Sequence, residues 1–532
     1  MASAPARPVR GRSVAAMPQL DEADVPALPT ENYRLLIFGI MLAALLQILD
    51  TTIANVAVPH MQSTLGATAD TINWVLTSYI VASAVAMPIT GWLAERIGAR
   101  RLFIASVASF IGASMLCGAA QNLTQMVIFR ALQGVAGAFI APLSQSAMID
   151  VTRPSRQAQI MAVWGMGVMI GPIFGPILGG WLTENWSWRW VFYVNLPLGI
   201  ISLVIMLAEM PSRAAVARKF DLMGFSLVGI ALASLQLMLD RGNQVDWFDS
   251  IETWIYLGVS VSATWMAIVH LATADQPIFR TELIRDPNFI LALGFMIVVG
   301  VVMMATIALL PPMLQRLFNY SVIDTGLTLT PRGVGTLISM QVSGILVRRG
   351  YDARVMVACG FVLAGTSLWM MSGWTLDVDY WNIVLSGFVQ GLGMGMVFIP
   401  INASAFATLP PALRTEGASL LNLFRSIGAS VGISVVSTLL ARNIQVSHGD
   451  LAGHMSSASV AGLDFSTIDR FQVLGDAILR MADGIVNQQA AMVAYVDDFY
   501  AMMWVTFAAI PLCVLLRQPQ ARTMPQQPIS DH

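Results

Sequence analysis

The chain has few charged residues, few cysteines and almost no lysine. Only 11% of its 532 residues are Asp, Glu, Lys or Arg, against about 25% in soluble proteins, which excludes a set of soluble domains. The one lysine, Lys219, follows Arg218, whereas a Walker phosphate-binding loop needs Gly-Lys-Ser/Thr, so the chain has no ATPase of its own. Its three cysteines all lie in apolar stretches, which supports neither a disulfide framework nor a metal site.

The few histidines and the absence of a net positive charge disfavour two further functions, a zinc protease and a nucleic-acid-binding protein. The five histidines never form His-Glu-x-x-His, the motif of a zinc protease. The net charge is −2, so no polycationic surface for nucleic acid is implied. These absences leave no indication of an enzyme.

Apolar residues, in contrast, are abundant and occur in blocks. They make up 56% of the chain, and the mean hydropathy is +0.68. Blocks of roughly 20 residues separated by short charged stretches are typical of a helical multi-pass membrane protein. Windows of about 19 residues predict fourteen spans, near 34–58, 73–95, 101–120, 124–148, 157–182, 189–208, 222–240, 252–273, 288–315, 323–347, 353–373, 380–408, 412–441 and 491–516.

The basic residues predict the orientation of these spans. With the N-terminus inside, 20 of the 29 Arg and Lys fall in cytoplasmic tails and loops, and six fall outside. The positive-inside rule therefore predicts that both termini are cytoplasmic. The first span is expected to be an uncleaved signal anchor.

The spans form two groups of six around an inserted pair. We expect the following organisation: a disordered cytoplasmic tail at 1–33, a six-helix bundle at 34–208, two linker helices at 222–273, a second bundle at 288–516 and a cytoplasmic tail at 517–532. The longest connection is 442–490, on the outer side. It has a Gly/Ser-rich part at 447–462, and apolar spacings of three or four at 467–490 that predict an amphipathic helix.

An internal repeat supports two bundles of the same orientation. The loop at 91–101 and the loop at 344–354 share Gly, Leu, Arg and Arg at equal offsets. Leu-Gln-Gly at 132–134 is echoed by Val-Gln-Gly at 389–391. Parallel repeats of this kind occur in secondary transporters, which place the substrate site near the midplane between the repeats.

Several motifs resemble those of one transporter family. Leu-Asp-Thr-Thr-Ile-Ala-Asn-Val-Ala-Val-Pro at 49–59 and the Gly/Pro run at 171–180 resemble motifs of the major facilitator superfamily drug:proton antiporters with 14 spans, the EmrB/QacA type. The loop at 91–101 resembles the superfamily's loop 2–3 motif, with Glu95 where Asp is usual. Arg-Ala-Leu-Gln-Gly at 130–134 resembles its proton-linked motif. Leu-Met-Leu-Asp-Arg-Gly at 237–242 is closest to the EmrB subgroup.

This resemblance implies a fold and a function. The expected fold is an all-α membrane protein with the major facilitator architecture of two six-helix bundles plus two inserted helices. The implied function is export of hydrophobic drugs across the bacterial inner membrane, driven by the proton gradient without another cofactor. For EmrB-like members the resemblance also implies a periplasmic adaptor (EmrA-like) and an outer-membrane channel (TolC-like).

Asp50 and Arg130 are the candidate proton-coupling residues. Asp50 is the one carboxylate well inside a span of the first bundle, where a charge costs roughly 2.5–3.5 kcal/mol on insertion scales and indicates function. Helical rise places Asp50 about 12 Å and Arg130 about 9 Å from the outer ends of their spans, so contact is possible. Separating the pair would let Asp50 take up a proton; the alternative is a static ion pair that joins the two spans.

Two small-residue motifs are candidates for conformational roles. In the fifth span, glycines every four residues share one helical face and permit close approach, while prolines bend the helix; either a pliable seal between the bundles or ordinary packing would use them. The residues of this antiporter motif are Gly171, Pro172, Gly175, Pro176, Gly179 and Gly180. The cytoplasmic gate implied by the resemblance, with Glu95 at its centre, comprises Gly91, Glu95, Arg96, Gly98 and Arg101.

Polar residues within spans are candidates to line the substrate cavity. They are Gln47, Asn55, Gln133, Asn195, Gln341, Gln390, Asn402, Asn422, Arg332 and Arg425. The two arginines have no carboxylate near them in the sequence of their spans, so they either contact an anionic substrate group or cap free carbonyls. Other functions also remain open, namely a dedicated exporter of one metabolite or siderophore and a non-transporting membrane scaffold.

Overall fold

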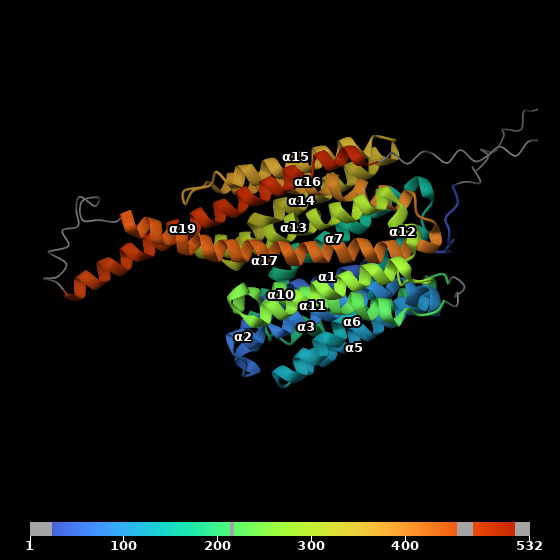
Figure 1. The fold of residues 1–532 in the computed structure, drawn as a ribbon, viewed down its shortest axis with the longest axis horizontal. Helices are drawn as coiled ribbons and strands as arrows, with labels where there is room; N and C mark the ends of the chain where they lie inside the picture. The colour runs from blue at the N-terminus through green and yellow to red at the C-terminus, as the bar shows by residue number, and fades with distance from the viewer. Residues whose placement is uncertain (1–23, 213–217, 455–471, 517–532) are drawn as a thin grey trace, which may run out of the picture.

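The long helices of the chain lie roughly parallel in two bundles (Figure 1). The structure is a computed structural model that describes residues 24–212, 218–454 and 472–516, and the tails predicted at 1–33 and 517–532 lie mostly outside it. No strand occurs among the described residues. The first bundle is formed by α1 (Tyr33–Thr64), α3 (Trp74–Ala86), α5 (Ala99–Ala119), α6 (Leu123–Asp150), α7 (Gln157–Asn185) and α9 (Asn195–Glu209).

The inserted helices and the second bundle follow in the predicted order. The inserted pair is α10 (Leu222–Arg241) and α11 (Ile251–Thr273). The second bundle is formed by α13 (Pro287–Leu317), α14 (Val322–Arg348), α15 (Ala353–Met371), α16 (Tyr380–Ala407), α17 (Arg414–His454) and α19 (Gln472–Ala508). Short helices α2 (Ala69–Ile72), α4 (Thr90–Leu93), α8 (Trp190–Tyr193) and α12 (Thr281–Arg285) occupy connections.

Twelve helical stretches of the described chain are long and apolar enough to cross a membrane. One of them, Trp74–Ala119, contains both α3 and α5, which the positive φ of Gly98 separates. The helix α14 has 27 residues but is too polar to be counted among the twelve. Separating α3 from α5 and adding α14 gives the fourteen long helices that the sequence predicts.

Local sequence explains where many helices begin. The side chains of Asn122, Asp221, Ser250, Ser321 and Asp352 each accept a hydrogen bond from a backbone N–H in the first turn of the helix that follows. Such caps satisfy donors that have no partner within the helix. Burial raises the pKa of Asp221, but hydrogen bonds from the Gly224 and Ile278 N–H groups and from His270 outweigh it, so the pKa lies below its usual value.

Several polar contacts join the two bundles at one end, which we call the inner end and which holds Glu95, Asp150 and Glu416. There Arg414 donates to Asp150 at 2.9 Å, and Ser419 donates to the Met87 carbonyl at 2.6 Å. Along the seam, α7 packs against α14, and α10 packs against both α3 and α17. The structure is therefore closed at its inner end.

The predicted loop 442–490 is wrong in one respect. The helix α17 continues to His454, and α19 begins at Gln472 and runs into the last span, so the described residues 472–490 do not form a helix of their own. Most of the Gly/Ser-rich part, from 455 onward, lies outside the described residues. Both long helices extend beyond the other helices at the outer end (Figure 1). The apolar spacing of 472–490 thus belongs to an extension of a transmembrane helix, and 467–471 lie outside the described residues.

Candidate functional site

Asp50 lies at the centre of a buried polar cluster in the first bundle. Its Oδ2 is 2.7 Å from Arg130 Nη1, and its Oδ1 accepts hydrogen bonds from Gln133 Nε2 at 2.8 Å and Asn195 Nδ2 at 2.7 Å. Asp50 is 0% exposed and Arg130 is 1% exposed. The helices α1, α6 and α9 each contribute to the cluster, so the carboxylate holds three helices together. Hydrogen bonds to a charged group of this kind contribute roughly 1.5–3 kcal/mol each.

Arg130 is fixed by groups other than Asp50. Its Nε donates to the Val75 carbonyl of α3 at 3.1 Å, and its Nη1 also donates to Gln133 Oε1 at 2.8 Å. The guanidinium stacks over the Tyr79 ring, with 4.4 Å to the ring centre. A third helix therefore orients the cation against the carboxylate, and an aromatic face excludes water. The carboxylate and the cation are therefore held in one fixed arrangement within the first bundle.

The predicted gate residue Glu95 joins a cluster of four charges at the inner end. Its Oε1 accepts from Arg280 Nη2 at 2.6 Å, and its Oε2 is 3.7 Å from Arg218. The same two residues contact Glu416 of α17. The Arg218 guanidinium lies 3.8 Å from Glu416 Oε2, and the backbone N–H of Arg280 donates to Glu416 Oε1 at 2.6 Å. The cluster therefore links a carboxylate of the first bundle to a carboxylate of the second.

The remaining predicted gate residues divide between packing and solvent. A Cβ built on Gly91 would lie 2.8 Å from the Glu416 Cβ, so α17 can approach only because residue 91 is glycine. Gly98 has φ +92°, a conformation that favours glycine. Arg96 and Arg101 are exposed, with no recorded partner in the described structure. The role of these two arginines in the gate stays a prediction.

Sequence reasoning missed Arg218 and Arg280, the two arginines that contact Glu95 and Glu416. Arg218 precedes α10 and Arg280 follows α11, so the inserted pair is anchored at both of its ends to the Glu95–Glu416 cluster. Neither arginine stood out in the sequence, because other basic residues share its connection: Arg213 and Lys219 accompany Arg218, and Arg285 follows Arg280. The loop motif drew attention to Arg96 and Arg101, which are nearer to Glu95 in sequence.

The glycines of the antiporter motif pack within the first bundle. A Cβ on Gly171 would lie 2.6 Å from Ile48, and one on Gly175 would lie 2.1 Å from Thr52 Oγ1. A Cβ on Gly179 would lie 3.2 Å from Ile53. All three neighbours belong to α1. The expectation that this glycine face forms the contact between the bundles is therefore wrong, because it is the α1 side of α7 that carries the glycines.

The rest of the motif lies on the same helix with other neighbours. Pro172 and Pro176 are half-buried and Gly180 is buried. The face that meets the second bundle carries Ile177, which would contact a Cβ built on Gly326 of α14 at 2.9 Å. The glycine face of α7 thus packs on α1, while the larger Ile177 side chain of α7 contacts α14.

The predicted cavity residues are distributed over three environments. Gln133 and Asn195 are bound to Asp50 and fully buried. Asn402 and Asn422 are buried in a chain of amides through Gln145 of α6: Gln145 donates to Asn402 at 2.7 Å, and Asn422 donates to Gln145 at 2.8 Å. These four residues therefore stabilise the packing rather than line an open cavity in this conformation.

The other predicted cavity residues are more varied. Gln390 is buried and donates to Thr306 at 3.1 Å, while Gln341 donates to the Met166 sulfur across the seam between the bundles at 3.2 Å. Gln47 is half-buried and Asn55 is exposed. Arg332 and Arg425 are half-buried in the second bundle.

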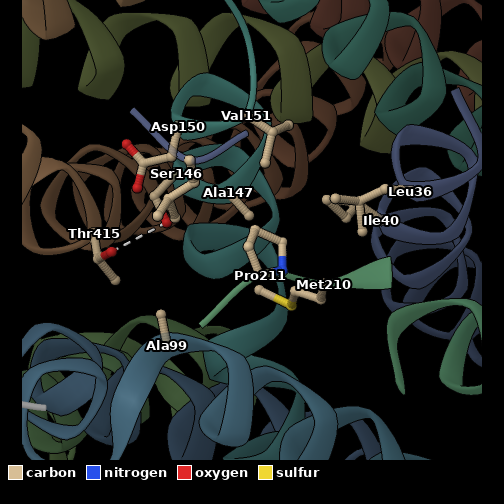
Figure 2. A pocket seen from close by; sticks show the side chains of 11 residues that line it. Leu36, Ile40, Ala99, Ser146, Ala147, Asp150, Val151, Met210, Pro211 and Thr415 are labelled. Carbon is tan, nitrogen blue, oxygen red and sulfur yellow. Dashed lines mark hydrogen bonds between the residues drawn. The ribbon is translucent and has the colours of Figure 1, made fainter. Parts of the chain in front are cut away.

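A pocket lies at the inner end of the first bundle, between α1, α6 and α17 (Figure 2). Its lining includes Leu36, Ile40 and Pro211, together with Ser146, which forms a hydrogen bond with Thr415. No predicted cavity residue lines it.

A carboxylate that the sequence reasoning overlooked is buried in α19. Asp498 is 0% exposed, and neither of its oxygens has a hydrogen-bond partner among the described residues. The neighbouring Phe499 ring stacks edge-on against Trp374, which follows α15 at the outer end. Asp497, its neighbour in sequence, is exposed.

Comparisons with known proteins agree with the motifs. The family model described as Major Facilitator Superfamily matches residues 40–433. The fatty acid resistance protein FarB of Neisseria gonorrhoeae is 34% identical over 508 residues, covering 93% of this chain and 98% of FarB. The multidrug export protein EmrB of Haemophilus influenzae is 35% identical over 432 residues, covering 79% of this chain and 83% of EmrB. EmrB of Escherichia coli is 34% identical over 433 residues, covering 80% and 83%.

A solved structure supports the fold. The crystal structure of the human organic anion transporter MFSD10 (TETRAN) has a TM-score of 0.56 to this chain at 12% identity, covering 90% of this chain and all of that one. The predicted fold class and the resemblance to the EmrB type are both confirmed. The chain therefore belongs to the Major Facilitator Superfamily, a family of membrane transporters rather than enzymes, with EmrB-type exporters among its relatives.

Proposed function

We propose that this protein exports hydrophobic toxic compounds across the bacterial cytoplasmic membrane in exchange for protons. The observation that carries the proposal is the buried Asp50–Arg130 pair at 2.7 Å. Replacing both partners of a buried ion pair by well-packed apolar residues is often neutral or stabilising, by roughly 1–4 kcal/mol, so helix packing alone does not require such a pair. The relatives named for multidrug export and fatty acid resistance support the same direction of transport.

The geometry of the Asp50 cluster supports a proposed cycle of proton exchange. Asp50 accepts from three side chains on α6 and α9, and those helices belong to the same bundle as α1. A rearrangement that withdraws Arg130 leaves a carboxylate in an apolar interior, where the neutral form is favoured and a proton is taken up. Restoring the ion pair expels that proton. Alternating exposure of the two sides would couple this exchange to substrate movement.

The membrane arrangement is part of the proposal. Both termini are placed in the cytoplasm, so the Glu95–Glu416 cluster closes the cytoplasmic side and α17 and α19 extend into the periplasm. Their extension supports a role as inner-membrane component of a three-part pump, with a periplasmic adaptor and an outer-membrane channel as partners.

Proteoliposomes test the proposal. Purified protein is reconstituted with a pH-sensitive dye inside the vesicles, and a lipophilic dye such as ethidium is added under an imposed pH gradient. We expect substrate-dependent proton movement and dye transport that collapses with an uncoupler. Dye transport that is indifferent to the gradient would contradict proton coupling, and absence of both would contradict transport.

A further inference from the structure

The Asp-Arg-Gly motif at 240–242 lies where α10 ends, at the outer side of the inserted pair. Asp240 is half-buried, and its Oδ2 accepts a hydrogen bond from the buried Thr77 hydroxyl of α3. The Arg241 guanidinium lies 5.5 Å from the centre of the Trp74 ring, also of α3. The motif therefore ties the outer end of the inserted pair to the start of α3.

The same part of α3 orients Arg130 from its other face. The Val75 carbonyl accepts from Arg130 Nε at 3.1 Å, and the Tyr79 ring stacks on the guanidinium, which lies 4.4 Å from the ring centre. Val75 and Tyr79, four residues apart, share one face of α3. Trp74 and Thr77, three residues apart, share the nearly opposite face. This short stretch of α3 thus lies between α10 and the cation that binds the carboxylate of α1.

The second bundle holds the motif through α17. Ser434 Oγ donates to the Leu239 carbonyl at 2.7 Å, and Thr438 Oγ1 donates to Asn243 Oδ1 at 2.6 Å. Leu239 and Asn243 flank the motif in sequence, and α10 packs against both α3 and α17. The helix α17 therefore holds the same end of α10 that Asp240 ties to α3.

A contiguous series of contacts consequently joins the second bundle to the Asp50–Arg130 pair. It runs from α17 to the outer end of α10, from Asp240 to Thr77, and from α3 to Arg130. Packed and hydrogen-bonded networks of this kind can carry coupling between distant parts of a protein. Because α3 contacts Arg130 through both a carbonyl and a ring, withdrawal of Arg130 from Asp50 involves α3 as well as α6.

We propose that Asp240 is a positioning residue for proton exchange. Through Thr77 it holds the segment of α3 that orients Arg130, so that movement of α17 reaches the proton-coupling pair by way of α10. A carboxylate suits this role, because a hydrogen bond to a charged acceptor is stronger than one to a neutral acceptor. This inference rests on the proposed exchange of a compound for protons, and it gives the inserted pair a part in that exchange.

Variants of the full-length chain in proteoliposomes test the link. Asp240→Ala removes the acceptor, Thr77→Val removes the donor, and Asp240→Asn keeps an acceptor oxygen without the charge. Ser260→Ala is the matched control, because it removes a hydrogen bond from α11 to the Ala231 carbonyl of α10, inside the inserted pair. The measurement is ethidium-dependent proton movement, from which the maximal rate and the half-saturating ethidium concentration are obtained.

We expect Asp240→Ala and Thr77→Val each to lower the maximal rate at least about threefold, as loss of one hydrogen bond can do, with the half-saturating concentration unchanged. The double variant should be no slower than the slower single variant, since both remove the same contact. Asp240→Asn should keep at least about half of the wild-type rate, and Ser260→Ala should keep all of it.

Three results would overturn the proposal. If Asp240→Asn is as slow as Asp240→Ala, the charge and not the hydrogen bond to Thr77 is what matters. Wild-type rates in both alanine and valine variants would remove the contact from the mechanism. Equal losses of rate and of ethidium affinity would assign the contact to structure alone.

Hydrogen exchange of the purified chain in lipid nanodiscs tests the link without transport. Ser434→Ala combined with Thr438→Val changes α17 alone, where both side chains bond to the end of α10. We expect backbone amides of residues 74–79 to exchange at least about threefold faster in this variant and in Asp240→Ala, and at the wild-type rate in Ser260→Ala. Unchanged exchange at 74–79 in the α17 variant would contradict the link. Failure of the proposed function is separate, because the faster exchange would persist while wild-type proteoliposomes show no ethidium-dependent proton movement.

Discussion

Arg130 Nη1 lies 2.7 Å from Asp50 Oδ2, and neither side chain has access to solvent. The pair joins α6 to α1, and Asn195 adds α9 by donating to the other carboxylate oxygen at 2.7 Å. The charge of Asp50 is therefore matched by one cation and two amide donors within one bundle.

Asp50→Asn should abolish proton-driven transport. Asparagine keeps an oxygen that can accept from Asn195 or Arg130, so insertion and some substrate binding should persist, whereas no group remains to exchange a proton. Proton movement in proteoliposomes should fall to the level of empty vesicles. Asp497→Asn, which removes an exposed carboxylate, should behave like wild type. Transport by Asp50→Asn with wild-type dependence on the pH gradient would rule out Asp50 as the coupling group.

A cross-link at the inner end should stop the transport cycle. A Cβ built on Gly344 lies 3.2 Å from the Ala162 Cβ in the other bundle, close to the 3.5–4.5 Å typical of disulfides. We expect Ala162→Cys combined with Gly344→Cys to oxidise readily and to hold the bundles together. Dye transport in proteoliposomes should then cease and return on reduction, while Ala162→Cys alone should be unaffected by oxidant. Wild-type transport by the cross-linked protein would show that this end does not open.

Gly175→Ala should destabilise the contact between α1 and α7. The added methyl group would lie 2.1 Å from Thr52 Oγ1 and 2.7 Å from its Cβ, and overpacking of this kind typically costs about 1–3 kcal/mol. Gly258→Ala is the matched control, because nothing lies within 4 Å of its Cβ position in α11 and alanine favours a helix by about 1 kcal/mol. Thermal unfolding followed by the exposure of buried cysteines should show a lower midpoint for the first variant only. Equal midpoints would mean that α7 moves away at little cost.

The fold was largely predictable because bilayer thickness dictates helix length. Apolar blocks and the repeated loop at 91–101 and 344–354 were enough to predict the helices and their order. The boundaries at the outer end were not, because polar residues can continue a helix once it has left the hydrocarbon. The helix α17 therefore runs to His454, through a segment that its composition suggested was a loop.

The residues of the candidate site could be predicted where a single charge inside the membrane is energetically costly. They could not be predicted where a contact depends on how several helices are arranged. Asp50 and Arg130 stand out because a charge within a span demands a partner at similar depth. The role of Arg218 and Arg280 depends on how the inserted pair is placed against both bundles, which spacing along the chain does not reveal. The direction of the glycine face of α7 likewise required a choice between α1 and α14, and the sequence favours neither.

Asp498→Asn should stabilise the protein. The carboxylate is fully buried without a recorded hydrogen-bond partner in the described residues, and burial of an unpaired polar group costs roughly 1–3 kcal/mol. An amide of the same shape cannot ionise, so it avoids the larger part of that cost. We expect a higher midpoint of thermal unfolding at neutral pH than for wild type or for Asp497→Asn. A lower midpoint would mean that Asp498 has a partner that becomes available outside this conformation.

Charging the outer extension of α17 and α19 should separate pumping from resistance. The two helices are tied to each other by His448 and Asp483 at 3.0 Å, and Val446 and Ile485 expose 55% and 54% of their surface there. Apolar residues on helices that project from a membrane protein are suited to binding an adaptor, although packing on the transporter itself is the alternative. If an adaptor binds here, Val446→Glu combined with Ile485→Glu should leave substrate-driven proton exchange in vesicles unchanged but reduce drug resistance of whole cells. The matched alanine variants remove bulk without adding charge and should have a smaller effect on resistance. A fall in both assays together would instead make the extension part of the transporter's own structure, and no change in either would make these two positions dispensable.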